Sequence, residues 1–119
     1  MSKRIQVGPN RWIGESEEPY VIAEIGINHN GSIDLCKKMI DQAVRVGVDA
    51  VKMQKRTIEE MYTKDALDVP YDKPYAFGKT YGEHKYALEF TDEQYFELQK
   101  YTHDQDCEFL VSGFDSTGF

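Results

Sequence analysis

Four polar side chains interrupt or end apolar segments of the sequence, and at the ends of strands such groups can bind a ligand. They are Glu24 in the first segment, Lys52 and Gln54 in the second, and Ser112 at the end of the third. A charged group inside a buried strand costs several kcal/mol of desolvation unless it has a partner. We therefore expect Glu24 and Lys52 either to form an ion pair with each other or to bind a ligand. Positive charge also gathers locally at Lys52, Lys55 and Arg56.

Each of these side chains has a structural interpretation as well. Glu24 and Lys52 can form an ion pair, or Lys52 can extend its long stem to solvent. Gln54 and Ser112 can satisfy neighbouring backbone groups. The residue types alone leave both interpretations open.

The first apolar segment, 21–25, predicts a parallel strand that is covered on both faces and ends in a polar loop. Asn28 and Asn30 in this loop tolerate left-handed backbone, so they are either turn formers or substrate ligands. His29 between them is expected to be exposed or hydrogen-bonded. A metal site within the chain is not expected, because its histidines lack metal-ligand spacing.

The sequence next predicts a strand–helix–strand unit. Ser32 suits the N-cap of a helix and Gly47 suits its C-terminal end. The strand 48–54 follows directly, which makes the two strands parallel. The apolar stripe of the helix is predicted to consist of Leu35, Met39, Ile40, Ala43 and Val46.

Residues 55–90 form a tyrosine-rich insert that is too long for an ordinary connection. Short helices are predicted at 57–62 and 81–90, and a solvated loop or an oligomer contact is favoured over a substrate lid. A capping box at Thr91 starts a helix that reaches about residue 105. Its inner face is Tyr95, Leu98, Tyr101 and Thr102, and the third strand, 107–112, follows it.

The N-terminal residues 1–19 predict a capping hairpin and a link. Gly8, Pro9 and Asn10 form the turn of this hairpin, which covers 3–14. Its apolar contacts are expected to be Ile5, Val7, Trp12 and Ile13.

The order of elements predicts an α/β fold with ligands at the carboxyl ends of the strands. A (β/α)8 barrel explains Glu24 and Lys52 better than a doubly wound sheet, because a barrel places one face of every strand in a shared interior. No glycine-rich phosphate loop follows the first strand. The prediction is the first three strands of a TIM barrel, with 20–119 as its beginning.

Composition excludes several classes of partner. The net charge of −7 disfavours nucleic acid and anionic membranes. No apolar segment approaches the ~20 residues that span a bilayer, and the first residues lack the apolar core of a signal peptide, so we expect a cytoplasmic protein. The two cysteines, Cys36 and Cys107, are expected to be buried free thiols.

Four motifs in a fixed order resemble the sialic acid synthase family. They are EIGINHNG at 24–31, VKMQKRT at 51–57, YGEHKYALEF at 81–90 and FLVSGFD at 109–115. The resemblance implies a barrel enzyme that condenses phosphoenolpyruvate with N-acetylmannosamine or a related amino sugar and releases phosphate. It also implies a divalent metal, manganese or magnesium, with ligands outside this segment, and we expect a homo-oligomer.

The same resemblance implies roles for individual residues. Glu24 matches the active-site glutamate, Lys52 the lysine that contacts phosphoenolpyruvate, and Gln54 the catalytic glutamine near the sugar. Ser112 matches a phosphate contact, and Gly113 beside it departs from the usual pattern. Asn28 and Asn30 belong to the first motif and are taken as substrate-binding candidates.

Two alternatives accompany this interpretation. One is a barrel synthase that makes eight-carbon or seven-carbon keto acids, and the other is a non-catalytic carbohydrate- or phosphate-binding module. A barrel needs about 250 residues, so we expect these 119 residues to be the N-terminal fragment of one synthase domain.

Overall fold

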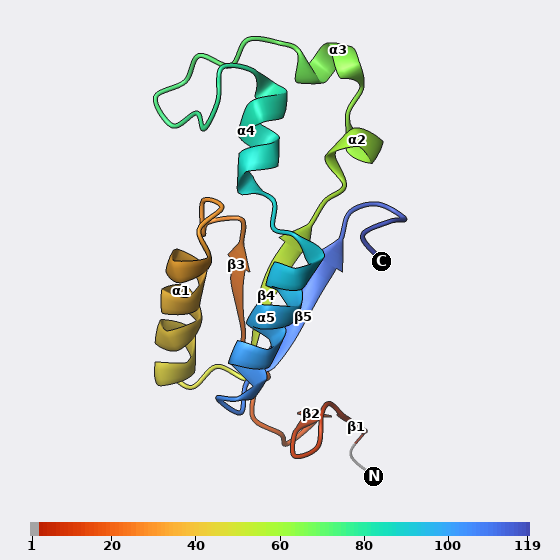
Figure 1. The fold of residues 1–119 in the computed structure, drawn as a ribbon. Coiled ribbons are helices and arrows are strands. Elements are labelled where there is room, and N and C mark those ends of the chain that lie inside the picture. The colour runs from red at the N-terminus through yellow and green to blue at the C-terminus, as the bar shows by residue number, and fades with distance from the viewer. Residues whose placement is uncertain (1–2) are drawn as a thin grey trace.

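The computed structural model describes residues 3–119 as a small α/β unit with a hairpin at one end and a helical insert at the other (Figure 1). Its strands are β1 (Arg4–Gln6), β2 (Trp12–Gly14), β3 (Ile22–Gly26), β4 (Ala50–Lys55) and β5 (Glu108–Gly113). Its helices are α1 (Ile33–Arg45), α2 (Ile58–Met61), α3 (Lys64–Leu67), α4 (Tyr81–Leu88) and α5 (Asp92–His103).

The central sheet has the order β3–β4–β5, and both pairs are parallel. Glu24 lies opposite Lys52 in the first pair, and Gln54 lies opposite Ser112 in the second. The register shifts between Glu24 and Gly26, where Gly26 takes a positive φ of 59°. The predicted parallel sheet is confirmed, and the three strands are those proposed to begin a barrel.

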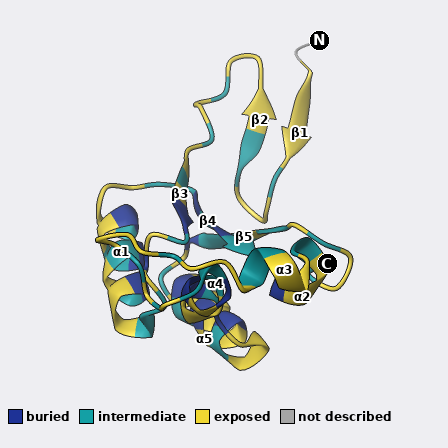
Figure 2. Ribbon diagram, turned by 90° about the horizontal axis from the view of Figure 1, so that it is seen from above, coloured by how far each residue is buried: buried dark blue, intermediate teal, exposed yellow. Residues whose placement is uncertain are grey.

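Helices α1 and α5 pack on one side of this sheet (Figure 2). Both begin where the sequence predicts, because Ser32 accepts a hydrogen bond from the Leu35 N–H and Thr91 forms a complete capping box with Gln94. The core between helices and sheet is apolar and includes Cys36, Ile40, Val51, Met53 and Leu98, all fully buried. Alternate residues of β4 therefore face away from the helices.

The apolar stripe of α1 was predicted only in part. Ile40 and Ala43 are buried, but the third fully covered position is Cys36. Leu35 is 37% exposed and Val46 is 77% exposed, so the prediction is wrong at both. The contact face is narrower than the apolar stripe of the sequence, because it follows the residues that reach β3, β4 and α5, such as Cys36 against Met53.

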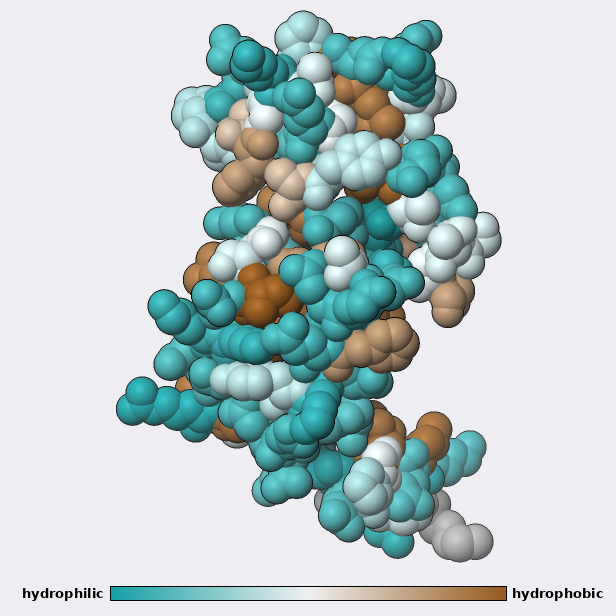
Figure 3. Space-filling model, viewed as in Figure 1, coloured by the Kyte–Doolittle hydropathy of each residue, from teal (hydrophilic) through white to brown (hydrophobic). Residues whose placement is uncertain are grey.

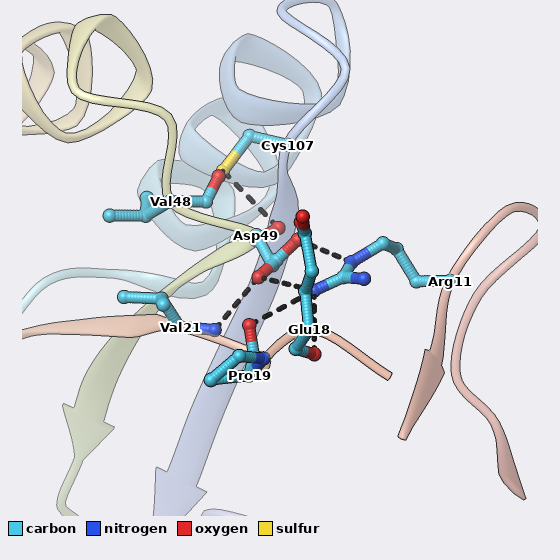
Figure 4. Close-up of polar contacts among 7 residues, drawn as sticks. All are labelled: Arg11, Glu18, Pro19, Val21, Val48, Asp49 and Cys107. Atoms are coloured by element: carbon cyan, nitrogen blue, oxygen red, sulfur yellow. Dashed lines mark hydrogen bonds and ion pairs between the residues drawn. The ribbon is translucent and has the colours of Figure 1, made fainter. Parts of the chain in front are cut away.

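The N-terminal hairpin is confirmed, and of its predicted apolar contacts Val7 and Trp12 are partly buried whereas Ile5 and Ile13 are exposed. Ile5 is 72% exposed and Ile13 is 42% exposed. A polar contact joins the hairpin to the sheet instead: the Arg11 guanidinium donates to both Asp49 oxygens at 2.7 and 3.1 Å (Figure 4). This contact lowers the pKa of the Asp49 carboxyl, which also accepts from the Val21 N–H at 2.8 Å.

The insert between β4 and α5 contains the three short helices α2, α3 and α4. Helices α2 and α4 appear where short helices are predicted, and α3 lies between them. A bridge between Pro70 and Thr80 closes the loop, and the rings of Tyr71, Tyr81 and His84 pack together inside it. The tyrosine-rich composition of the insert therefore provides its small core.

The molecular face seen in Figure 3 is mainly hydrophilic, with hydrophobic side chains in small separate patches. No helix among residues 3–119 is long and apolar enough to cross a membrane.

Candidate functional site

Three of the predicted site residues come together on the face of the sheet that turns away from α1 and α5. Lys52 Nζ lies 3.0 Å from Glu24 Oε2. Gln54 Nε2 donates to Glu24 Oε1 at 3.3 Å. The Glu24 carboxylate therefore contacts both neighbours with different oxygens, which aligns the three side chains near the carboxyl ends of β3 and β4.

The contact between Glu24 and Lys52 is accessible rather than buried. Their side chains retain 42% and 36% of their exposure, respectively. An ion pair this exposed contributes only about 0–1 kcal/mol to stability. The pair accordingly contributes little to holding the fold together, and a ligand approaching this face can reach the ammonium group.

Ser112 lies on the far side of β4 from Glu24. It is the register partner of Gln54 on β5 and is half-buried. Glu24, Lys52 and Gln54 form a polar row on this face of the sheet. Ser112 extends the row onto β5, at the same level as Gln54.

Asn28 and Asn30 lie in the loop after β3. The Asn28 side chain donates to the Ile25 carbonyl at 3.0 Å, and Asn30 has a positive φ of 55°. Both perform the turn-forming role that the sequence allows, and both are exposed. Their role as substrate ligands stays a prediction.

His29 is hydrogen-bonded, and it is also fully buried. Its ring stacks on Phe90 at 4.0 Å, and Nδ1 accepts from the Gly31 N–H at 3.0 Å. Burial lowers the pKa of His29 to about 4, so the ring is neutral at pH 7. His29 thus joins the loop after β3 to the segment that enters α5.

The structure adds residues at the carboxyl ends of the strands to which the sequence assigned no role in the site. Arg56 Nη2 donates to Gln54 Oε1 at 2.6 Å, which lengthens the row by one member. Glu89 accepts from the Arg56 backbone N–H, and burial raises the pKa of this carboxyl. Asp115 accepts from Thr57 Oγ1 at 2.8 Å. The sequence signal for Arg56 was the local positive charge that it forms with Lys52 and Lys55, and its spacing from Lys52 and Gln54 is that of alternate strand positions.

The larger hollows of the described surface lie away from this row. One of about 810 Å³ lies among α2, α3 and α4, and one of about 630 Å³ lies between the hairpin and the amino ends of the strands. The row lies instead on an open sheet face, where charged and polar groups of β3 and β4 converge. Within residues 3–119 no three His, Cys, Asp or Glu side chains gather to hold a metal ion.

Comparison with known proteins decides the family. Residues 39–119 match the NeuB family. The chain belongs to the NeuB family. It is 43% identical over 115 residues to human N-acetylneuraminate-9-phosphate synthase, covering 97% of this chain and 32% of that protein. It is also 34% identical to N,N'-diacetyllegionaminic acid synthase of Legionella pneumophila, covering 92% of this chain and 33% of that protein.

A solved NeuB relative confirms the arrangement of the elements. The structure of the N-acetylneuraminic acid synthetase of Leptospira borgpetersenii superposes with a TM-score of 0.77 at 26% identity. The match covers 99% of this chain and 36% of that one. The resemblance to sialic acid synthases is thereby confirmed, and the α/β fold is like part of such an enzyme. This NeuB chain spans about a third of the length of these relatives.

Proposed function

We propose that this chain forms part of a synthase that condenses phosphoenolpyruvate with N-acetylmannosamine or a related amino sugar. The observation that carries the proposal is the Glu24–Lys52–Gln54 cluster, on an accessible sheet face near the carboxyl strand ends. Ligands of α/β barrels bind at this end of the strands. The relatives named above are nonulosonic acid synthases, which supports the same chemistry.

Each residue of the cluster has a task in this proposal. Lys52 provides a fixed positive charge for the carboxylate or phosphate of phosphoenolpyruvate. One carboxylate oxygen of Glu24 contacts the ammonium group of Lys52, and its other oxygen accepts a hydrogen bond from Gln54. A ligand anion that approaches Lys52 can share its N–H donors without displacing the carboxylate, because an ammonium group has three. Glu24 and Gln54 then orient the hydroxyl groups of the amino sugar.

The overall reaction balances without a redox partner. The enol carbon of phosphoenolpyruvate forms a bond to the aldehyde carbon of the sugar, water adds to the neighbouring carbon, and phosphate leaves. By holding both substrates in contact, the site provides much of the rate acceleration of the condensation. The described residues do not form a metal site of their own. A manganese or magnesium ion therefore stays a prediction for the remainder of the enzyme.

The test is phosphate release by the full-length natural protein. It should release phosphate from phosphoenolpyruvate only when an amino sugar of the N-acetylmannosamine type is present. Five-carbon and four-carbon sugar phosphates serve as controls, because adding three carbons to them gives the eight- and seven-carbon keto acids of the rival synthases. Release with those sugars and not with the amino sugar would contradict the proposal.

A further inference from the structure

Arg56 continues the polar row just beyond the carboxyl end of β4. It follows the last residue of β4, and its spacing from Lys52 and Gln54 is that of alternate strand positions. Its Nη2 donates to Gln54 Oε1 at 2.6 Å, and Gln54 in turn donates to Glu24. The guanidinium group therefore lies at the end of a continuous chain of contacts that begins at Lys52.

The guanidinium plane is also supported by an aromatic ring. It lies 4.3 Å from the centre of the Phe114 ring. Phe114 follows β5, where alternation places it on the same side as Ser112. Two neighbouring strands thus contribute to the position of Arg56, which restricts the directions in which its free N–H groups point.

One end of this guanidinium is left without a partner. Lys52 and Lys55 each pair with a carboxylate, at 3.0 and 2.9 Å. Arg56 Nη1 is buried, and no group within residues 3–119 accepts a hydrogen bond from it. A buried, unsatisfied N–H on a charged group is costly, and proteins keep such groups mainly where they serve a purpose.

We propose that Arg56 is a substrate-binding residue whose guanidinium group binds an anionic oxygen of a substrate, phosphate or carboxylate. A guanidinium matches such groups with its planar fork of donors, which a lysine lacks. This inference rests on the proposed synthase function. The anion has two possible sources in that reaction, phosphoenolpyruvate itself and a phosphate ester on the amino sugar.

Lys55 provides a matched control for this residue. It is adjacent to Arg56, carries the same charge and belongs to the same strand end, but its ammonium group pairs with Asp92 of α5 and lies 5.0 Å from the Tyr95 ring. It therefore points to the helix side of the sheet. Lys55→Gln removes one positive charge from the region without touching the row.

The experiment is steady-state kinetics of the full-length protein as wild type, Arg56→Gln, Arg56→Lys and Lys55→Gln. The substrates are phosphoenolpyruvate, N-acetylmannosamine and its 6-phosphate. Arg56→Gln should raise KM at least tenfold for the substrate whose anion it binds, with kcat changed less than threefold. Arg56→Lys should restore part of the loss, and Lys55→Gln should match the wild type. An effect confined to phosphoenolpyruvate or to the phosphorylated sugar identifies the source.

Unchanged KM values for all three substrates in Arg56→Gln would overturn the proposal. An equal rise in KM for Lys55→Gln would also overturn it, because removing any positive charge from this region would then have the same effect. If the wild type releases no phosphate with any sugar, the synthase function fails, and direct binding still tests Arg56. In that case calorimetric titration with phosphoenolpyruvate and with inorganic phosphate should show at least tenfold weaker binding of one anion to Arg56→Gln, and equal binding of both would overturn the inference.

Discussion

Replacing Lys52 by methionine should separate binding from stability in the candidate site. The substitution keeps an unbranched side chain of similar length and removes the charge. Because the contact with Glu24 is exposed, its loss should change the free energy of unfolding by about 1 kcal/mol or less. A charge-assisted hydrogen bond to a substrate anion contributes roughly 1.5–3 kcal/mol. Losing it should lower kcat/KM for phosphoenolpyruvate by roughly tenfold to 150-fold.

The assay is phosphate release by the full-length protein, with denaturant unfolding measured in parallel. Lys55→Met is the control, since Lys55 lies on the same strand as Lys52 and also pairs with a carboxylate, but with Asp92 of α5 on the helix side. A double-mutant cycle with Glu24→Gln measures how strongly the two groups act together in the reaction. An unchanged kcat/KM in Lys52→Met, or an unfolding loss above ~2 kcal/mol, would refute the reasoning that Lys52 serves binding rather than structure.

The other predictions concern the core, the buried histidine and the assembly. Leu98→Ala should lower the free energy of unfolding by about 2–5 kcal/mol, because Leu98 is fully buried between α5 and the sheet, whereas Val46→Ala at a 77% exposed position should change it by less than ~0.5 kcal/mol. Denaturant titrations measure both, and equal losses would contradict the packing described. The unfolded chain takes up a proton on His29 near pH 6.5 while the folded chain resists until about pH 4, so this histidine's contribution to stability is complete above pH 6.5 and declines as the pH falls toward 4. Unfolding between pH 4 and 7 should show a smaller loss in His29→Gln than in the wild type, and identical pH profiles would exclude His29 as the cause. Light scattering should show the full-length protein as a homo-oligomer, and a monomeric mass at micromolar concentration would exclude that expectation.

Local patterns in the sequence were sufficient to predict the order of the main elements. Ser32 and the Thr91 capping box determine where α1 and α5 begin, because they satisfy backbone N–H groups within a few residues. The period of two along β4, which can be read from the sequence, separates Val51 and Met53 in the core from Lys52 and Gln54 on the other face. These features depend on contacts close in sequence, which a pattern can encode.

Contacts between distant segments could be decided only by the tertiary structure. The pairing register brings Glu24 opposite Lys52, and only then does the contact of 3.0 Å form. His29 is buried because Phe90, from the far side of the insert, stacks on it. Leu35 and Val46 are apolar yet exposed, because burial depends on which elements reach a helix face and not on its own periodicity. The free Nη1 of Arg56 arises in the same way, since Gln54 and Phe114 orient the guanidinium from different strands.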